Sequence, residues 1–224
     1  MHKKLIIAID GPAGSGKSTV GKLIAKKLGL MYLDTGAMYR ALTLKAMRDN
    51  IDLNDEKALV ELAGKTRIEL TTEADAEKTS VRLDGEDVTL DIRTPEVTDN
   101  IKYIARIPGV RKCMVKIQRA IGAKAGAVLE GRDTTTVVFP DAAHKFYLDA
   151  DLKERARRRF KELRAMGMKA ALRDVENDAR RRDSGDKTRD AGPLKRASGA
   201  VYIDTTKMSV NEVVRKILSH IKNK

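Results

Sequence analysis

The octapeptide GPAGSGKS at residues 11–18 constrains the fold of this 224-residue chain more than any other feature. It matches the pattern G-x-x-x-x-G-K-[ST] without deviation. The apolar run at residues 5–10 precedes it, and a helical pattern of apolar residues follows it up to Gly29. Glycines let backbone N–H groups converge on an anion, and the positive end of the following helix adds to the attraction. The sequence therefore predicts a strand, a phosphate-binding loop and a helix in succession.

This loop indicates how a nucleoside triphosphate would be held. Lys17 is expected to reach the β- and γ-phosphates, and the hydroxyl of Ser18 is expected to bind Mg²⁺. ATP and GTP are the expected ligands, but the N-K-x-D motif typical of GTPases does not occur in the sequence. In "AVLEGRD", Arg132 stands between Glu130 and Asp133, which favours substrate contact over metal binding alone. The predicted triphosphate-binding residues of the loop are Gly11, Pro12, Ala13, Gly14, Ser15, Gly16, Lys17, Ser18 and Thr19.

Short apolar runs alternate with helical patterns along the chain. The helical patterns include residues 37–48, 55–64 and 109–123. This alternation predicts an α/β fold with a doubly wound parallel sheet of five strands, flanked by helices. The expected strands are LIIAID (5–10), MYLD (31–34), AVLEG (127–131), KFYLD (145–149) and AVYID (200–204).

Residues 66–95 have a different pattern, in which polar and apolar residues alternate. Asp84-Gly85 is a favourable two-residue hairpin turn, so we expect a small antiparallel insert here. Asp151 with Glu154, and Ser209 with Glu212, have the spacing of capping boxes that start two further helices. Since no internal repeat and no linker is apparent, we expect one domain over residues 1–224.

The chain is strongly basic, with a formal net charge of +13. Residues 152–196 contain sixteen lysines and arginines against eight acidic residues, and two helical stretches flank the sequence MGMK. Such a charge indicates polyanionic partners, but tryptophan is absent and tyrosine and phenylalanine are few, which disfavours base-stacking nucleic-acid surfaces. The pattern favours small phosphorylated ligands and a mobile, arginine-rich lid that closes over them and excludes water.

Several features bound the location and chemistry of the protein. The apolar run after Lys3 and Lys4 is too short for a secretion signal, and no run reaches the length of a membrane span. The single cysteine, Cys113, excludes an internal disulfide and is expected to be a buried structural thiol. We expect a cytoplasmic protein that is a monomer, and we assign no role to the three histidines.

The chain resembles bacterial cytidylate kinases over nearly its whole length. The resemblance is carried by IDGPAGSGKST, YLDTGAMYRA, IRTPEV, GRDTTTVVFPDA, RDSGDKTRDAGPL and IDTTKMS, in that order. It implies a P-loop nucleoside monophosphate kinase that transfers phosphate from ATP to CMP or dCMP with Mg²⁺. It also implies a core (1–65, 103–152 and 196–224), a monophosphate-binding insert (about 66–102) and a lid (about 153–195). No nucleic-acid or membrane partner is expected.

The resemblance implies roles for residues outside the phosphate loop. Arg157 and Arg158 match lid positions that contact ATP. Lys17, Arg132, Arg182 and Arg189 match positions that neutralise the transferring phosphates. The implied CMP-binding residues are Thr35, Tyr39, Arg40, Arg111, Arg132, Asp133, Arg182 and Asp186. Among these, Arg111 and Asp133 are expected to read the cytosine edge.

Three positions depart from the family pattern: Lys102 replaces a serine near the base, Thr134-Thr135-Thr136 replaces a glycine-containing run, and Glu130 replaces an aspartate. An ammonium cannot accept a hydrogen bond from the cytosine amine, so the tolerance of UMP is open. Two alternatives remain at this stage. One is a kinase for another small acceptor, such as UMP, shikimate or a coenzyme precursor. The other is a basic nucleic-acid-binding protein with an incidental ATPase activity.

Overall fold

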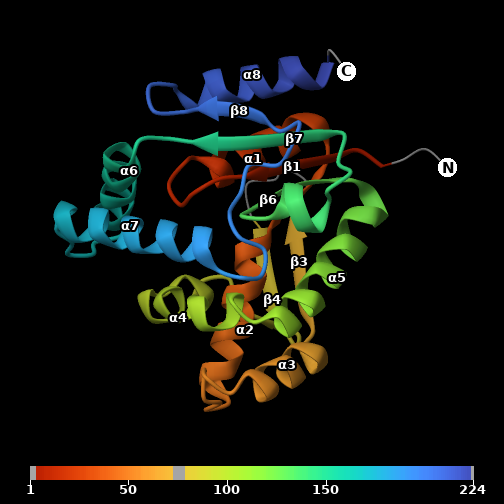
Figure 1. Ribbon diagram of the computed structural model, residues 1–224, viewed down its shortest axis with the longest axis vertical. Helices are drawn as coiled ribbons and strands as arrows, with labels where there is room; N and C mark the ends of the chain where they lie inside the picture. The colour runs from red at the N-terminus through yellow and green to blue at the C-terminus, as the bar shows by residue number, and fades with distance from the viewer. Residues whose placement is uncertain (1–3, 73–78, 223–224) are drawn as a thin grey trace.

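The computed structural model describes residues 4–72 and 79–222, and it is organised around one parallel sheet (Figure 1). The strand order is β2-β6-β1-β7-β8, and every pairing in the sheet is parallel. The five-stranded parallel sheet predicted from the sequence is therefore confirmed. Its strands are β1 (Ile6–Asp10), β2 (Met31–Asp34), β6 (Ala127–Gly131), β7 (His144–Asp149) and β8 (Val201–Asp204).

Helices pack against this sheet in two separate apolar clusters. One cluster joins the sheet to α1 (Lys17–Leu28) and α8 (Val210–Lys222). The other joins it to α2 (Thr35–Arg48), α3 (Glu56–Lys65) and α5 (Pro108–Ala125), as the sequence patterns predict. Cys113 is partly buried against this second cluster, which fits a structural thiol.

A second, antiparallel sheet of three strands confirms the predicted insert. Its strands are β3 (Ile68–Thr72), β4 (Thr79–Leu83) and β5 (Glu86–Asp87), and Asp84 and Gly85 form the turn with φ of 51° and 95°. The apolar side chains of β3 and β4 belong to the same buried cluster as those of α2. The insert is thus packed into the main core rather than folded around a core of its own. A single 3₁₀ turn, η1 (Asp91–Arg93), and α4 (Pro95–Ala105) follow it.

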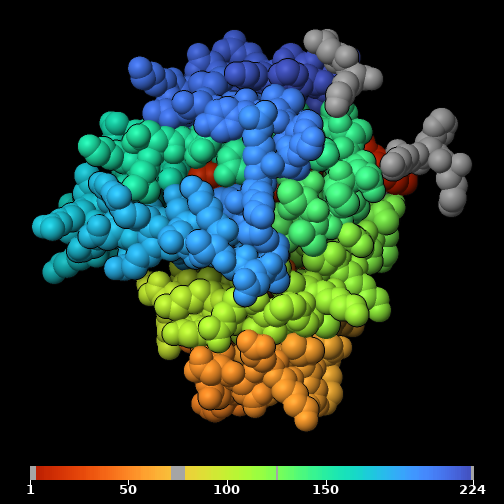
Figure 2. Space-filling model, viewed as in Figure 1, coloured from red at the N-terminus to blue at the C-terminus, as the bar shows by residue number. Residues whose placement is uncertain are grey.

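The basic region forms a packed pair of helices, α6 (Leu152–Ala165) and α7 (Leu172–Thr188), which extends to one side of the sheet (Figure 1). Helix α7 continues through Gly185, so most of the polar stretch after residue 180 is helical. The segment from residue 189 to β8 then runs across the face of the molecule in front of the sheet (Figure 2). Movement of this region as a lid, the roles of insert and core, and the monomeric state remain predictions.

The two capping predictions have different outcomes. At α8, the Glu212 carboxylate accepts from the backbone N–H and the hydroxyl of Ser209 at 2.7 Å, so this capping box is confirmed. At α6, Asp151 accepts from the N–H of Lys153 at 2.8 Å, but Glu154 accepts from Arg158 at 3.0 Å. The reciprocal half of that box is therefore wrong, because arginine side chains one turn later compete for the glutamate. Within residues 4–72 and 79–222, no helix combines the length and hydrophobicity needed to cross a bilayer.

Candidate active site

The predicted site residues gather at one edge of the main sheet, where the parallel strands end. β1, β2 and β6 end at Asp10, Asp34 and Gly131; in the strand register Asp10 lies beside Gly131, and Asp34 lies beside Glu130. Ligands of open α/β sheets bind outside this edge. In Figure 2, helices α6 and α7 and the segment after them cover this edge, and only a small red area of the N-terminal part is visible between them.

The phosphate loop joins β1 to α1 and has a backbone that requires glycine. Gly14 and Gly16 have φ of 77° and 90°, which L-residues with a side chain rarely adopt. Helix α1 begins at Lys17 and has no acidic residue in its first turn, so its positive end is not neutralised. The Nζ of Lys17 donates to the carbonyl of Pro12 at 2.7 Å and to Ser15 Oγ at 3.4 Å. The loop thus has the backbone of an anion-binding site, and the side chain of Lys17 folds back onto it.

The ammonium of Lys17 is nearly completely buried, with 4% of the residue exposed. Burial, and second the nearby charge of Arg132, lower its pKa to about 8. Carboxylates at Glu130, Asp10 and Asp186 act in the opposite direction. Lys17, in the phosphate loop, therefore lies close enough to Arg132 for their charges to interact. Since Arg132 is predicted to bind the acceptor, the cations predicted for the two nucleotides lie close together.

The oxygen donors beside the loop fit a magnesium ion. The hydroxyl of Ser18 donates to Glu130 Oε1 at 2.7 Å, and the hydroxyl of Tyr32 donates to the same oxygen at 3.1 Å. Across the described ranges, no cluster of three or more His, Cys, Asp or Glu side chains is arranged to hold a metal. A hydroxyl and one carboxylate suit Mg²⁺, which is usually held by few protein oxygens together with substrate phosphates. The glutamate at position 130 keeps the oxygen chemistry expected of the aspartate it replaces.

A buried ion pair occupies the place predicted for recognition of the base. Arg111 on α5 and Asp133 after β6 are each 5% exposed and hydrogen-bonded to each other. Arg111 also donates to the carbonyl of Ala105 at 2.9 Å, and its guanidinium lies 5.3 Å from the centre of the Tyr39 ring. A Cβ at Gly192 would collide with both members of the pair. The backbone around Gly192 thus lies in direct contact with the Arg111–Asp133 pair and forms one side of the predicted base pocket.

Three arginines with assigned roles converge around Asp186 of α7. Arg132 donates to its carboxylate at 2.6 Å, and Arg189 lies 3.5 Å from it. Burial raises the pKa of Asp186, but Arg132 and then Arg189 outweigh this and lower it. Desolvation and then the charge of Arg132 lower the pKa of Arg182, which also donates to the carbonyl of Thr98 at 3.2 Å. Arg132, Arg182 and Arg189 therefore form one cationic group around the carboxylate of Asp186, which acts on all three.

The start of α2 supplies the other two predicted acceptor ligands. Asp34 caps this helix by accepting from the N–H of Ala37 at 3.0 Å, and it accepts from Arg40 at 2.7 Å. The hydroxyl of Thr35 donates to the backbone carbonyl of Glu130 at 2.8 Å, which leaves its oxygen lone pairs for an incoming donor. Both residues lie at the same sheet edge as Arg132.

The two lid arginines predicted to contact ATP behave differently. Arg158 donates to the hydroxyl of Thr205 at 3.1 Å and to its carbonyl at 2.6 Å, and it approaches the carbonyl of Gly14 at 3.5 Å. Arg157 is exposed and pairs with Glu154 at 2.7 Å, so the structure does not bring it to the loop. The helical period explains the difference, because successive residues on α6 point in directions about 100° apart.

Lys102 contacts an aromatic ring of its own helix. It is exposed on α4, and its Nζ lies 5.1 Å from the centre of the Tyr103 ring. A cation over an aromatic face is a favourable solvent-exposed arrangement. The serine-to-lysine departure therefore places no ammonium against Asp133.

Sequence reasoning assigned no role to two buried charged residues beside the loop. Arg155 donates to the carbonyls of Ala150 and Ala13 at 2.9 and 3.1 Å and forms two hydrogen bonds with Asp183. The sequence could have indicated this role, because Arg155 stands three residues before Arg158 and so lies on the same face of the helix. Asp10, the last residue of β1, is completely buried and accepts from Thr134 and Thr135. The sequence could have indicated Asp10 as well, because it is a charged residue at the end of an apolar strand.

The fold and this site define a P-loop kinase. The parallel sheet carries the phosphate loop after its first strand, a group of arginines lies near that loop, and a pair of helices covers this edge. Shikimate kinase from Acinetobacter baumannii, solved in complex with shikimate, has a similar fold: the TM-score is 0.50 at 17% identity, over 99% of this chain and 95% of that one.

Sequence comparison is more specific. The profile of the cytidylate kinase family matches residues 7–223. The chain is 50% identical to cytidylate kinase of Desulforamulus reducens over 221 residues, which cover 99% of this chain and 98% of the relative. It is 49% identical to cytidylate kinase of Caldanaerobacter subterraneus subsp. tengcongensis over 216 residues, covering 96% and 94%. This chain belongs to the cytidylate kinase family.

Proposed function

We propose that the chain transfers the γ-phosphoryl group of ATP to CMP and dCMP, producing ADP and CDP or dCDP. The observation that carries this proposal is the buried ion pair between Arg111 and Asp133. Asp133 directly follows Arg132 in the sequence and lies at the same sheet edge as the phosphate loop. Membership of the cytidylate kinase family supports the same reaction.

Recognition of cytosine rests on hydrogen-bond polarity. The exocyclic amino group of cytosine is a donor, and the carboxylate of Asp133 is an acceptor held in place by Arg111. Uracil presents a carbonyl oxygen at the same position, and a buried carboxylate would repel it. A site that leaves buried polar groups unpaired rejects the wrong ligand strongly. Tyr39, whose ring packs on Arg111, would line the wall beside the pyrimidine.

Phosphate binding is divided between two groups of cations. The loop residues 11–19 with Lys17 would hold the phosphates of ATP, and Arg158 of α6 would approach them from the lid. Arg132, Arg182 and Arg189, with Arg40, would hold the phosphate of CMP, and Thr35, whose proton is donated to the carbonyl of Glu130, would accept a hydrogen bond nearby rather than bind the phosphate. Asp186 would orient Arg132 and Arg189 rather than bind phosphate, since it is itself an anion. Arg157 would join only if the lid moved.

The chemistry needs positioning and charge neutralisation more than covalent help. The attacking oxygen of CMP is already anionic, so no protein nucleophile and no strong general base is required. Lys17 and the three arginines would stabilise the negative charge that spreads over the transferring group. Ser18 and Glu130 would hold Mg²⁺, which supplies further neutralisation of the triphosphate when bound. Closure of α6 and α7 would exclude water and suppress ATP hydrolysis.

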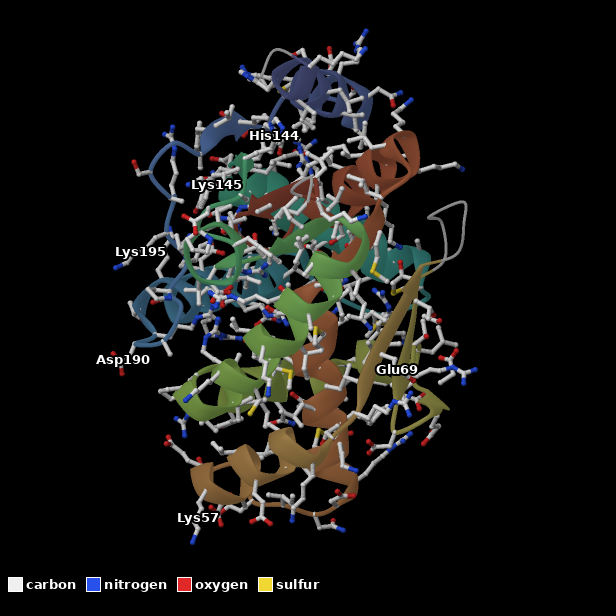
Figure 3. All side chains as sticks on the ribbon, turned by 90° about the vertical axis from the view of Figure 1, so that its right-hand side faces the viewer. Lys57, Glu69, His144, Lys145, Asp190 and Lys195 are labelled. Atoms are coloured by element: carbon white, nitrogen blue, oxygen red, sulfur yellow. The ribbon has the colours of Figure 1, made fainter. Side chains whose placement is uncertain are left out.

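A panel of acceptors with ATP tests this proposal. We expect CMP and dCMP to be phosphorylated, and UMP, AMP and shikimate to react at least about a hundredfold more slowly in kcat/KM. In Asp133→Asn, whose amide can also donate, the ratio of CMP to UMP turnover should fall about tenfold or more. Asp190→Asn is the matched control, because it makes the same chemical change at a carboxylate that is exposed and points outward to solvent (Figure 3).

Three outcomes would overturn the assignment. Equal turnover of CMP and UMP by the unaltered protein would remove cytosine recognition, and turnover of shikimate alone would identify another small-acceptor kinase. Tight, salt-sensitive binding of RNA or DNA that stimulates ATP hydrolysis would instead favour a nucleic-acid-binding ATPase.

A further inference from the structure

Asp10 forms the most completely hydrogen-bonded carboxylate at the sheet edge, yet it has no part in the reaction described above. Its Oδ1 accepts from the N–H of Thr134 at 2.8 Å and from the Thr134 hydroxyl at 2.7 Å. Its Oδ2 accepts from the N–H and the hydroxyl of Thr135 at 2.7 and 2.5 Å. All three residues are at most 1% exposed. One buried carboxylate thus receives four hydrogen bonds from two successive residues.

These contacts suit an ionised carboxylate better than a protonated one. An ionised carboxylate is an acceptor only, and each of its oxygens here faces one N–H and one O–H donor. Charge-assisted bonds of this kind are shorter and stronger than bonds between neutral groups. Burial raises the pKa of Asp10 above its ordinary value, and the four donors act in the opposite direction and limit the rise. Thr134 and Thr135 begin a π-helical turn, Thr134–Val138, whose unusual backbone aims both N–H groups at the same carboxylate.

The cluster lies between the two halves of the active site. Asp10 is followed directly by Gly11, the first residue of the phosphate loop, whereas Thr134 is preceded directly by Arg132 and Asp133. The backbone of Gly11 lies close against β7, since a Cβ there would collide with the carbonyl of Leu148. The Asp10 carboxylate is therefore a direct side-chain connection, in addition to the strand pairing, between the residue before the phosphate loop and the residues that follow Arg132 and Asp133.

We propose that the Asp10–Thr134–Thr135 cluster sets the spacing between the donor and the acceptor nucleotide, with Asp10 as a positioning residue. The proposal rests on the assignment of Arg132 and Asp133 to the acceptor. Each half of the site keeps its own ligands without the cluster, so each nucleotide alone binds normally. What depends on the cluster is the distance and angle between the two halves. The two threonine hydroxyls thus supply half of the four hydrogen bonds that hold Asp10.

A bisubstrate probe, in which adenosine and cytidine are joined through a pentaphosphate, measures this spacing directly. In Thr134→Val/Thr135→Val the backbone N–H bonds and the side-chain shape remain, and only the two hydroxyl donors are removed. We expect its Kd for ADP and for CMP, each measured alone by calorimetry, to stay within about twofold of the unaltered protein. Its affinity for the bisubstrate and its single-turnover rate should fall about ten- to a hundredfold.

Two matched variants complete the design. Thr134→Ser/Thr135→Ser restores both hydroxyls and should recover bisubstrate affinity to within about threefold. Thr136→Val removes the next hydroxyl along, which is directed at the carbonyl of Asp133 at 3.5 Å and not at Asp10, and should change nothing. If the double valine variant fails to fold, the single Thr135→Val variant replaces it, with a smaller loss of bisubstrate affinity expected.

The outcomes distinguish a failure of the spacing role of Asp10 from a failure of the assignment of Arg132 and Asp133 to the acceptor. Unchanged bisubstrate affinity in the valine variant would overturn it, and so would equal losses for ADP, CMP and the bisubstrate, which indicate general structural support. Arg132→Ala tests the premise independently: it should weaken CMP alone. If Arg132→Ala leaves CMP binding intact, the acceptor assignment fails, whatever the valine variant does.

Discussion

The buried ammonium of Lys17 makes nucleotide binding sensitive to pH in a range where most lysines do not titrate. Its pKa in the nucleotide-free protein is about 8, because burial and then Arg132 disfavour the charge. A polyphosphate is attracted by the ammonium and not by the neutral amine. We therefore expect kcat/KM for ATP, which reports the free enzyme, to be half its maximum near pH 8 and to fall about tenfold per pH unit above it.

The same titration affects stability with a definite sign. The folded pKa of Lys17 lies below the model-peptide value of 10.5, so the unfolded chain binds more protons between about pH 8 and 10.5. Over this window the free energy of unfolding of the nucleotide-free protein should therefore rise with pH. The pKa difference corresponds to about 3 kcal/mol, relative to a Lys17→Met variant that has no such group.

Initial rates from pH 7.5 to 9.5 at saturating CMP, with urea unfolding at the same pH values, provide the assay. Lys17→Arg is the control: its guanidinium stays charged, so its kcat/KM should be lower but flat with pH. If kcat/KM of the unaltered protein is flat up to pH 9.5, and its stability relative to Lys17→Met does not change, the burial argument is refuted.

Three further substitutions test single contacts. Lys102→Ser should leave the ratio of CMP to UMP turnover within about twofold, because Lys102 is exposed, and a rise in selectivity would contradict this placement. Gly192→Ala should raise KM for CMP about tenfold or more with little effect on KM for ATP, because the new methyl group would displace Asp133 and Arg111. Equal effects on the two KM values would exclude a specific role of this contact in binding CMP. Glu130→Gln should raise the Mg²⁺ concentration needed for half-maximal rate about tenfold, since it removes the charged oxygen beside Ser18, and an unchanged requirement in a magnesium titration would argue against this site.

The main features of the fold could be predicted because they depend on local patterns. The apolar runs fixed the five strands to within one residue at either end, and Asp84-Gly85 identified the hairpin because left-handed φ values require such residues. The phosphate loop follows from its spacing alone. The extent of α7 was harder to predict, because Gly185 and a dense set of charges suggest a loop, whereas packing against α6 keeps this stretch helical.

The individual site contacts were less accessible, since they depend on which side chains compete for the same partner. The sequence grouped Arg157 with Arg158, but only Arg158 faces the phosphate loop. It could not show that Asp10 and Thr134, separated by more than half of the chain, share a hydrogen bond. Such contacts arise from the strand order, which places β6 beside β1, and no local pattern encodes that order.

The central claim is that two phosphorylated nucleotides meet at the carboxyl edge of the sheet, between the Lys17 loop and the arginine group. A crystal structure with ADP, CMP and Mg²⁺ bound tests it most directly. We expect the cytosine against Asp133 and the CMP phosphate within hydrogen-bond distance of Arg132 and Arg189, facing the end of ADP held by the loop. CMP bound anywhere else, with Asp133 still paired only to Arg111, would contradict the account.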